Sequence, residues 1–350
     1  METHVLRVDP GEPDRRLIAL AAQALRSGQL VAFPTETVYG LGANALDPEA
    51  IERIFEVKGR PATNPVIVHL AQAKQLGQVA VGFDASVQAL VSRFWPGPLT
   101  LVLPKQPQLP SNLTAGLDTI AVRVPEHRVA QALIHAAGVP IGAPSANRST
   151  RPSATKAEHV LDDLAGRIEY VIDGGPAILG LESTVIDMTT PKPRLLRPGA
   201  LPLERLRSVL PQLQGTWPAA PGSEDAAPSP GLQGKHYAPQ AKLILLEGPR
   251  HAVLNYLRER FHQEQAEGRR VGLLLCSDDL ADLTELAADR FDLGQRGKLG
   301  MAAVSLFDGL RQLDSLGVDL ILTRSFGEND LGFAITDRLR RGASDVIRVE

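Results

Sequence analysis

The chain has 350 residues, 43% of them hydrophobic and 22% charged, and its 37 Lys and Arg against 40 Asp and Glu leave a formal net charge of −3. This balance excludes a chain that is basic throughout and binds nucleic acid through charge alone, but it permits a local basic cleft. The single cysteine, Cys276, excludes an internal disulfide framework and a cysteine zinc site, and its apolar neighbours predict a buried strand residue. No apolar run approaches the ~20 residues that span a bilayer, and no signal peptide is evident. We therefore expect a cytoplasmic protein without a membrane segment.

The first 210 residues alternate short apolar runs with amphipathic segments. Asp14 is placed to cap a helix that ends near Gly28. Apolar runs bounded by Pro, Gly or polar residues predict buried strands at 30–33, 66–70, 99–103 and 120–124. Helices are expected near residues 85–94, 129–137 and 155–164. This mixture predicts an α/β domain over residues 1–210.

The composition changes after residue 210. Six Pro and four Gly fall within the 29 residues from Pro211 to Pro239, too many for a helix or a central strand. We therefore expect a linker at 211–240. Beyond it, strands are predicted at 243–246, 271–275 and 320–323, with helices near 251–267 and 301–316. This alternation predicts a small doubly wound domain with a parallel sheet over residues 241–350.

The segment 34–42, Pro-Thr-Glu-Thr-Val-Tyr-Gly-Leu-Gly, places hydroxyls and a carboxylate directly after a predicted strand. Open α/β sheets bind ligands at such strand ends, although an ordinary turn with Thr hydroxyls bonded to the backbone fits equally well. Residues 40–45, Gly-Leu-Gly-Ala-Asn-Ala, fit a relaxed dinucleotide-binding pattern weakly, because several residues separate them from the strand. A tight turn is the simpler interpretation.

Lys58 and Arg60 form a basic pair in a segment expected to be irregular. Residues two apart in an extended chain point to one side, so both cations would share a face. A guanidinium and an ammonium on one face suit a polyphosphate, and a solvated loop is the alternative.

Two predicted strands carry a basic side chain among apolar residues. His69 lies inside the run 66–70, where a satisfied core histidine is more common than a ligand or a base. Arg123 shares a strand face with Thr119 and Ala121, and a buried guanidinium needs an anionic partner. A protein carboxylate and a substrate carboxylate both satisfy that need.

Three further loops combine small residues with polar groups beside strands, at 140–149, 180–187 and 195–199. Small side chains allow a ligand to approach the backbone. No single loop is specific, but several polar loops next to strands can converge on one cleft.

Taken in order, these motifs resemble the threonylcarbamoyl-adenylate synthases, the YrdC-like family, in their longer two-domain form. The matching motifs are Lys58-x-Arg60, Ser145-x-Asn147, the segment 34–42, Phe-Trp-Pro-Gly-Pro-Leu-Thr at 94–100, Ser-Thr-Val at 183–185, Arg-Pro-Gly at 197–199, Ser-Pro-Gly at 229–231 and His-Tyr-Ala-Pro at 236–239. Residues 232–235 depart from the pattern. The resemblance implies a YrdC-like twisted open mixed sheet with helices, followed by a smaller Rossmann-like parallel α/β domain.

The resemblance also implies a reaction. A nucleotidyltransferase of this family makes L-threonylcarbamoyladenylate and pyrophosphate from L-threonine, bicarbonate or CO2, and ATP. The product serves threonylcarbamoyl modification of the adenosine next to the anticodon of tRNA. Mg²⁺ is expected to be held by the ATP phosphates, downstream tRNA-modification proteins are expected partners, and direct tRNA contact is left open.

The family's site residues map onto this sequence position by position. The implied threonine pocket consists of Thr35, His69, Arg123, the Ala143 backbone and Ser183. The implied ATP contacts are Arg60, Asn64, Thr119, Ser145, Ser153, Arg197 and Tyr237. The implied catalytic cluster is Lys58, Arg60, Ser145 and Asn147. No obligatory nucleophile stands out, so we expect catalysis by positioning and electrostatics, with the linker acting as a lid that excludes water.

Two other classes of function stay open at this point. A basic concave face also suits a tRNA- or double-stranded-RNA-binding module without catalysis. A related carbamoyl-transfer domain with another acceptor is the second. Lys58→Ala should weaken the salt-sensitive affinity of an RNA-binding module only slightly, whereas in the synthase it should abolish ATP turnover. Dependence of pyrophosphate release on threonine separates the carbamoyl-transfer domain from the synthase.

Overall fold

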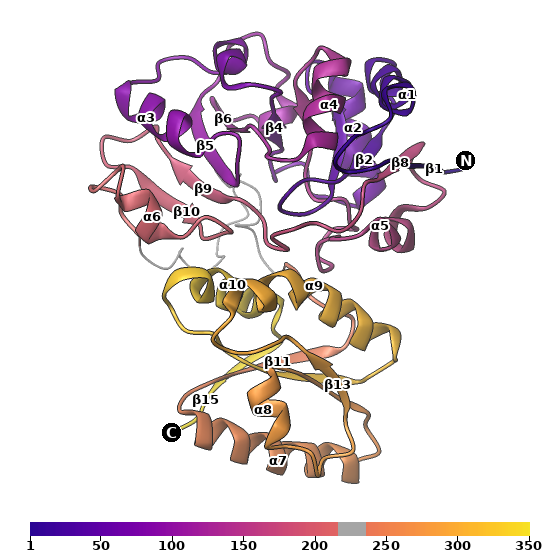
Figure 1. Cartoon of the computed structure of the whole chain (residues 1–350), viewed down its shortest axis with the longest axis vertical. Helices are drawn as coiled ribbons and strands as arrows, with labels where there is room; N and C mark the ends of the chain where they lie inside the picture. Colours follow the sequence, from indigo (N-terminus) through magenta and orange to yellow (C-terminus); the bar gives the residue numbers. More distant parts are fainter. Residues whose placement is uncertain (216–235) are drawn as a thin grey trace. The chain divides into compact units, whose positions relative to one another are not determined.

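The computed structural model describes residues 1–215 and 236–350, and these divide into two units (Figure 1). Of the described residues, the first unit holds 1–149 and 153–215, and the second holds 150–152 and 236–350. The second unit thus includes three residues that lie far from it in the sequence. Most of the expected linker at 211–240 lies outside the described residues.

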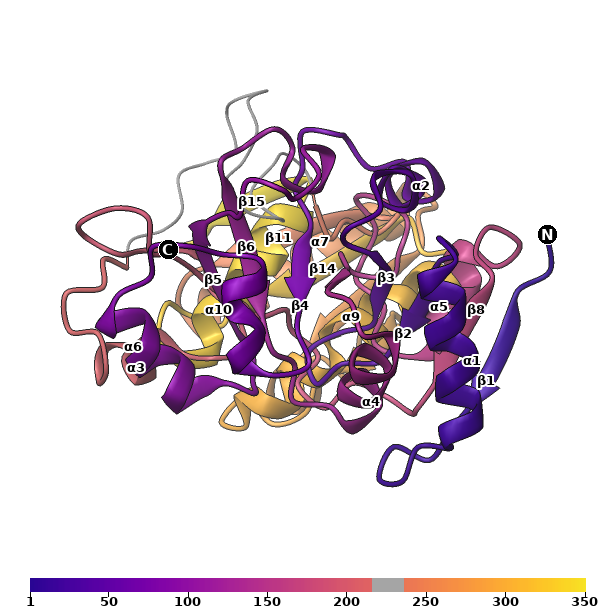
Figure 2. The ribbon, with the colours of Figure 1, turned by 90° about the horizontal axis from the view of Figure 1, so that it is seen from above.

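The first unit is built on a ten-stranded mixed sheet in the order β1-β8-β2-β3-β7-β4-β6-β5-β9-β10. Strand β1 pairs with β8 at one edge (Figure 2), β2 and β3 are antiparallel, and β4 and β6 are parallel. All four strands predicted in this region are present, and the expected open mixed sheet is confirmed. The strands are β1 (His4–Arg7), β2 (Val31–Phe33), β3 (Gly40–Asn44), β4 (Ile67–His69), β5 (Leu99–Pro104), β6 (Thr119–Arg123), β7 (Ile141–Gly142), β8 (Tyr170–Asp173), β9 (Thr184–Asp187) and β10 (Arg194–Arg197).

The predicted helices of the first unit are also present. Asp14 caps the first of them, as expected, by accepting hydrogen bonds from the backbone N–H groups of Arg16 and Leu17. The helices are α1 (Arg15–Arg26), α2 (Pro48–Lys58), α3 (Ala85–Phe94), α4 (Arg128–Ala137), α5 (Ala157–Leu164) and α6 (Leu203–Arg207), with 3₁₀ turns at Ala73–Gln78 and Asn112–Thr114.

Helix α2 corrects the expectation of an irregular basic segment. Its cap Asp47 accepts backbone hydrogen bonds, Pro48 occupies the first turn, where a missing N–H costs nothing, and Gly59 ends it with a left-handed φ of 61°. Lys58 is therefore the last helical residue, and Arg60 follows the left-handed turn. The two cations are not alternate residues of an extended chain.

Strand β3 corrects both interpretations of residues 40–45, because Gly40–Asn44 is a strand antiparallel to β2 rather than a tight turn. A dinucleotide fingerprint requires a strand, a glycine turn and then a helix, so that interpretation is wrong. Close packing explains a glycine here: a Cβ at Gly42 would lie 2.9 Å from the Phe33 ring and 3.0 Å from Ile141.

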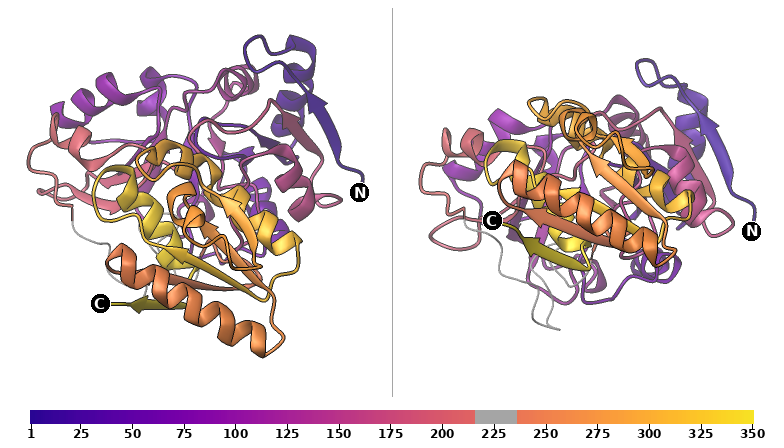
Figure 3. Two further views of the ribbon diagram at one scale, coloured as in Figure 1. Left: turned by 60° about the horizontal axis from the view of Figure 1, so that its bottom comes forward. Right: turned by 90° about the horizontal axis from the view of Figure 1, so that it is seen from below.

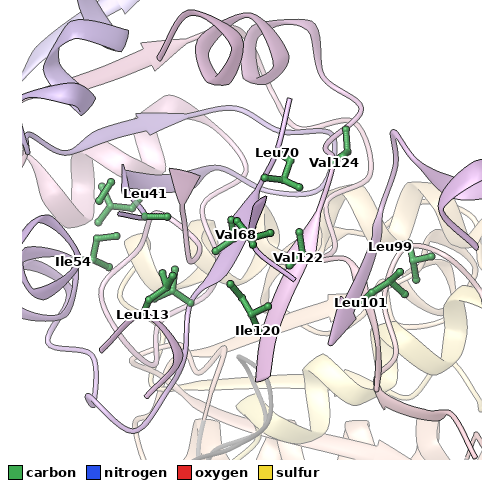
Figure 4. Packing of buried hydrophobic residues seen from close by; sticks show 14 of the residues in the cluster. Leu41, Ile54, Val68, Leu70, Leu99, Leu101, Leu113, Ile120, Val122 and Val124 are labelled. Atoms are coloured by element: carbon green, nitrogen blue, oxygen red, sulfur yellow. The ribbon is translucent and has the colours of Figure 1, made fainter. Parts of the chain in front are cut away.

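The two faces of strand β6 carry different chemistry. Ile120, Val122 and Val124 are buried in the main hydrophobic cluster of this unit, which Figure 4 shows packed with Val68 and Leu70 of the neighbouring strand region. Residues of β6 alternate between faces, so Arg123 points to the opposite side. One face of the sheet therefore anchors the strand, while the other presents polar groups.

The second unit contains a five-stranded sheet in the order β13-β12-β14-β11-β15 with every pairing parallel. Helices α9 and α10 cover one face and α7 and α8 the other (Figure 1), and Figure 3 shows α7 running along its face. The predicted doubly wound domain is confirmed. The elements are β11 (Lys242–Glu247), α7 (Arg250–Ala266), β12 (Val271–Leu275), α8 (Ser277–Ala281), β13 (Asp289–Asp292), α9 (Leu299–Ser315), β14 (Leu320–Arg324), α10 (Asp330–Gly342) and β15 (Asp345–Arg348).

Cys276 directly follows β12 and is buried, as predicted, although it caps α8 instead of belonging to the strand. Burial raises the pKa of its thiol to about 11, which keeps the thiol protonated and unreactive near neutral pH. Among the described helices, none has the length and apolar character needed to cross a membrane.

Candidate active site

Arg123 is the centre of a buried polar cluster in the first unit. Its Nε donates to Nε2 of His69 at 2.8 Å, and its two terminal nitrogens donate to the Thr37 and Thr35 hydroxyls at 3.0 and 3.1 Å. Strand pairing explains the first contact, because His69 and Arg123 are directly opposed in the parallel ladder of β4 and β6. Two segments far apart in the sequence, residues 35–37 and strand β4, thus meet at the guanidinium of a third.

His69 is a neutral acceptor in this cluster. Its Nδ1 lies 3.2 Å from the carbonyl of Ile67, so the tautomer that satisfies both ring nitrogens carries the proton on Nδ1 and leaves Nε2 to accept from Arg123. Burial, reinforced by the neighbouring Arg123 charge, lowers the pKa of His69 well below its usual value. The imidazole holds the guanidinium in place without adding charge, as expected of a satisfied strand histidine.

Glu36 supplies the anionic partner that the buried arginine needs. Its Oε1 lies 3.3 Å from Arg123, and both side chains are almost fully buried. Burial lowers the pKa of Arg123, and the carboxylates of Glu36 and Glu182 act in the opposite direction. Of the two partners left open by the sequence, a protein carboxylate is therefore present. Glu36 and Thr37 were missed as site residues, although both stand in the polar segment after β2.

Ser183 lies in a second polar group at the start of β9. Its hydroxyl is 2.7 Å from that of Thr100, and Arg197 donates to the Ser183 carbonyl at 2.9 Å and to its hydroxyl at 3.2 Å. Leu101 pairs with Val122 in the antiparallel ladder of β5 and β6, and the same register places Thr100 beside Arg123. The Ser183 group therefore adjoins the Arg123 cluster on one face of the sheet.

Ser153 joins the same region through Glu182, to which its hydroxyl donates at 2.5 Å. Both residues are buried. The Glu182 charge also acts on Arg123, which ties this pair electrostatically to the cluster. Glu182 is a further residue that the sequence did not single out, because an isolated carboxylate in a loop gives no signal of its own.

Lys58, Ser145 and Asn147 are brought together, as the resemblance implies. The buried Lys58 ammonium donates to the backbone carbonyls of Ser145, at 2.6 Å, and Asn147, and the Lys58 carbonyl accepts from the N–H of Ser149. The end of helix α2 is thereby fastened to the loop after β7. Its cation is fixed in position, which a lysine on a solvated surface would not be.

Arg60 forms a separate buried group with Asn64. Its guanidinium donates to the Asn64 amide oxygen at 2.6 Å and to the Pro65 carbonyl at 2.8 Å. Thr119, partly buried at the start of β6, lies on the Arg123 face of that strand. The backbone N–H of Ala143 donates to the Ile67 carbonyl at 2.9 Å, which places it beside β4.

Tyr237 belongs to the second unit. Its ring is buried, stacks on Phe307 with centroids 5.5 Å apart, and lies 5.1 Å from the guanidinium carbon of Arg338. Tyr237 itself has a positive φ of 62°, a conformation that costs energy for a bulky residue and needs support from its surroundings. The ring thus anchors residues 236–239 to helices α9 and α10 of that unit.

Comparison with known proteins places this arrangement in a family. A model described as telomere recombination matches residues 23–199, and one described as threonylcarbamoyl-AMP synthase, C-terminal domain, matches residues 201–344. A Pyrococcus abyssi protein named threonylcarbamoyl-AMP synthase is 48% identical over 327 residues, which cover 93% of this chain and 94% of the relative. The chain belongs to the threonylcarbamoyl-AMP synthase family. A family member from Bacillus subtilis is 44% identical over 328 residues, which cover 93% of this chain and 92% of the B. subtilis protein.

A solved structure of the same family, described as P. abyssi Sua5 complexed with L-threonine, has a TM-score of 0.94 and 45% identity, and the match covers 99% of this chain and 100% of that one. Another solved structure is described as a form of P. abyssi Sua5 in which a histidine and the following tyrosine are replaced by alanine. It has a TM-score of 0.92 and 44% identity, and the match covers 99% of this chain and 98% of that one. These matches extend over both sheets, so the family assignment holds for the first and the second unit alike.

Proposed function

We propose that this chain makes L-threonylcarbamoyladenylate and pyrophosphate from L-threonine, bicarbonate or CO2, and ATP, using the polar face of the first unit. The family membership supplies the reaction, a nucleotidyl transfer that serves threonylcarbamoyl modification of tRNA. The observation that carries the proposal at the level of residues is the buried Arg123, which His69 and two threonine hydroxyls hold in one orientation. A fixed, buried guanidinium is suited to recognise a small carboxylate.

The threonine end of the proposed site lies around that guanidinium. Arg123 binds the substrate carboxylate, and His69 and Thr35 orient the guanidinium of Arg123. Ser183 and the Ala143 backbone form the walls of the pocket. The relative solved with L-threonine supports this choice of ligand for the family. Because the cluster is buried, each charge-assisted hydrogen bond is stronger there than in water.

The ATP end is proposed to lie around the cations at the end of helix α2 and the loops that they hold. The proposed nucleotide contacts are Arg60, Asn64, Thr119, Ser145, Ser153, Arg197 and Tyr237, with Lys58 and Asn147 completing the catalytic cluster. Arg60 and Lys58 are both buried and held by backbone carbonyls. Fixed cations stabilise charge that develops on a phosphate without reorganising during the reaction.

The chemistry needs two anions to meet. The carbamate of threonine attacks the α-phosphorus, the bond to the bridging oxygen breaks, and the electron pair leaves on pyrophosphate. Lys58 and Arg60 reduce the repulsion between the reactants and stabilise the leaving group. Trapping of a covalent adduct between the enzyme and a reactant during turnover would contradict this direct transfer.

Magnesium is proposed to enter with the ATP phosphates, whose charge it offsets. In the parts of the chain that the structure describes, no three His, Cys, Asp or Glu side chains are grouped to hold a metal ion. Glu36 and Glu182, the buried carboxylates of the site, face Arg123 and Ser153. The residues present therefore fit a metal carried by phosphate oxygens better than one held in a protein cage.

Three further elements belong to the same proposal: a catalytic domain at 1–210, a lid-forming linker at 211–240 and a small α/β domain at 241–350. Most of the proposed lid lies outside the described residues, so its support is the family motif at 236–239. The proposed cytoplasmic location rests on the sequence, in which neither a long apolar run nor a signal peptide is evident. Downstream tRNA-modification proteins as partners rest on the family resemblance. Truncation after residue 210 tests the lid: a folded first domain should remain, with little synthesis.

Pyrophosphate release from ATP tests the proposed function. The rate should require both L-threonine and bicarbonate, and L-alanine in place of L-threonine should give little product. Release of pyrophosphate without threonine, or equal release with another acceptor amine, would contradict the proposal and favour a different carbamoyl transfer.

A further inference from the structure

The proposed reaction requires a group that accepts a proton. α-Amino groups are largely protonated near neutral pH, and an ammonium group has no electron pair with which to attack CO2. One proton must therefore leave the amine before the carbamate forms. The residues mapped from the family motifs include no carboxylate that could accept this proton. The inference that follows therefore rests on the proposed function and adds a residue to it.

Most groups of the Arg123 cluster are unsuited to that task. His69 uses both ring nitrogens, one toward Ile67 and one toward Arg123, and its pKa is lowered further by the adjacent cation. The Thr35 and Thr37 hydroxyls are far too weakly basic to hold an extra proton. Glu182 already accepts a hydrogen bond from the Ser153 hydroxyl.

Glu36 is different, because only one of its two oxygens is engaged. Oε1 lies 3.3 Å from the Arg123 guanidinium, whereas Oε2 is buried and has no hydrogen-bond partner among the residues that the structure describes. A buried carboxylate oxygen without a donor is costly, so such an atom in a native site calls for an explanation. A hydrogen-bond donor of the substrate, bound beside Arg123, would supply the partner that Oε2 lacks.

The surroundings of Glu36 favour uptake of a proton. Burial raises the pKa of its carboxyl; the Arg123 charge and backbone N–H groups lower it, and the nearby Glu126 carboxylate raises it again. Of the charged groups that face Glu36, Arg123 thus provides the main stabilisation of the ionised form. A substrate carboxylate bound to Arg123 would compete for that charge and favour protonated Glu36 at the moment the amine arrives.

We propose that Glu36 accepts a proton from the ammonium group of L-threonine bound at Arg123. The N–H bond breaks, its electron pair stays on nitrogen, and the proton forms an O–H bond at Oε2. The charges also balance: the substrate carboxylate replaces ionised Glu36 as the counter-ion of Arg123, while the ammonium and the carboxylate neutralise each other. The amine is then ready to attack CO2.

Glu36→Gln tests this role, because glutamine keeps the shape and a hydrogen-bonding oxygen but cannot take the proton. At pH 7 threonine-dependent pyrophosphate release should fall by about 10²–10⁴-fold. The kcat/KM that Glu36→Gln retains for threonine should rise about tenfold per pH unit below the amine pKa. The variant can use only threonine whose amine is already neutral in solution, and that fraction grows with pH. Wild-type enzyme should show a shallower rise over the same range.

Two comparisons make the result decisive. Glu126→Gln removes an exposed carboxylate whose effect on the pKa of Glu36 is the smallest of the causes acting on it, so this variant should keep a rate near that of the wild type and its shallow rise with pH. Glu36→Asp keeps the carboxylate and should be slower without gaining the steep pH dependence, which covers the case in which Glu36→Gln does not fold. A uniform loss at every pH in Glu36→Gln would show that Glu36 is only a counter-ion, and an unchanged rate would overturn the proposal outright. Both outcomes leave threonine-dependent activity of the wild type, and hence the proposed function, intact.

Discussion

Arg123 and His69 lie directly opposite each other on two parallel strands, and the guanidinium Nε donates to the imidazole Nε2 at 2.8 Å. The two residues are 54 positions apart in the sequence. The register of the sheet therefore fixes the direction of the guanidinium before any substrate binds. Preorganisation of this kind lowers the cost of ordering the site on binding.

Arg123→Lys tests the recognition of the substrate carboxylate. Lysine keeps the charge but loses the planar fork that is held by His69 and the two threonine hydroxyls. We expect the KM for threonine to rise by about 10- to 100-fold, with a smaller change in the KM for ATP. Steady-state pyrophosphate release at varied threonine provides the measurement, and an unchanged KM for threonine would contradict the assignment.

Lys58→Met tests the fixed cation at the end of helix α2. The thioether cannot donate to the Ser145 and Asn147 carbonyls and carries no charge toward the phosphates. We expect kcat to fall by about 10²–10³-fold. Lys74→Gln, at an exposed position in the 3₁₀ turn Ala73–Gln78, is the matched control and should retain full activity. Near-normal turnover in Lys58→Met would exclude Lys58 from the catalytic cluster.

His69 predicts a pH-dependent stability. The folded protein keeps this imidazole neutral because burial and Arg123 lower its pKa, whereas the unfolded chain binds a proton as the pH falls below about 6.5. The free energy of unfolding should therefore fall with falling pH, at up to ~1.4 kcal/mol per pH unit from this residue. His69→Gln removes that contribution, so it should lose less stability than the wild type between pH 7 and pH 5. Equal losses in thermal or urea unfolding would contradict the neutral assignment.

Tyr237 combines an anchoring role with a proposed nucleotide contact, and two substitutions separate them. Tyr237→Ala removes the ring that stacks on Phe307 and should destabilise the second unit by about 3 kcal/mol. Tyr237→Phe keeps the ring, so its stability should be close to that of the wild type, while the KM for ATP rises by about 2- to 10-fold if the hydroxyl contacts the nucleotide. An unchanged KM for ATP in Tyr237→Phe would limit this residue to anchoring.

The sequence predicted the elements whose signals are local. The run at 120–124 is rich in β-branched residues bounded by polar ones, and Asp14 stands directly before an amphipathic stretch, so strand β6 and helix α1 were both expected. Helix α2 is absent from the sequence-based elements because the segment around Lys58 and Arg60 was expected to be irregular, although Pro48 is well tolerated in a first turn and Gly59 is suited to end a helix.

The part of the site that the sequence did not provide depends on long-range pairing. Arg123 was predicted to need an anion, but its partner Glu36 lies 87 positions away, and only the order of the strands brings the two together. Thr100 reaches Ser183 in the same way, across 83 positions. The types of residue in a site can thus be inferred from local chemistry, whereas their pairing requires the topology of the sheet.

Incorporation of labelled bicarbonate into an adenylate tests the central claim most directly. Wild-type protein, incubated with ATP and Mg²⁺, should transfer the label to a nucleotide product only when L-threonine is present, with one pyrophosphate released for each label incorporated. The Arg123→Lys and Lys58→Met forms should both be deficient in this transfer. A labelled adenylate that forms equally well without threonine, or pyrophosphate released without any incorporated label, would contradict the account.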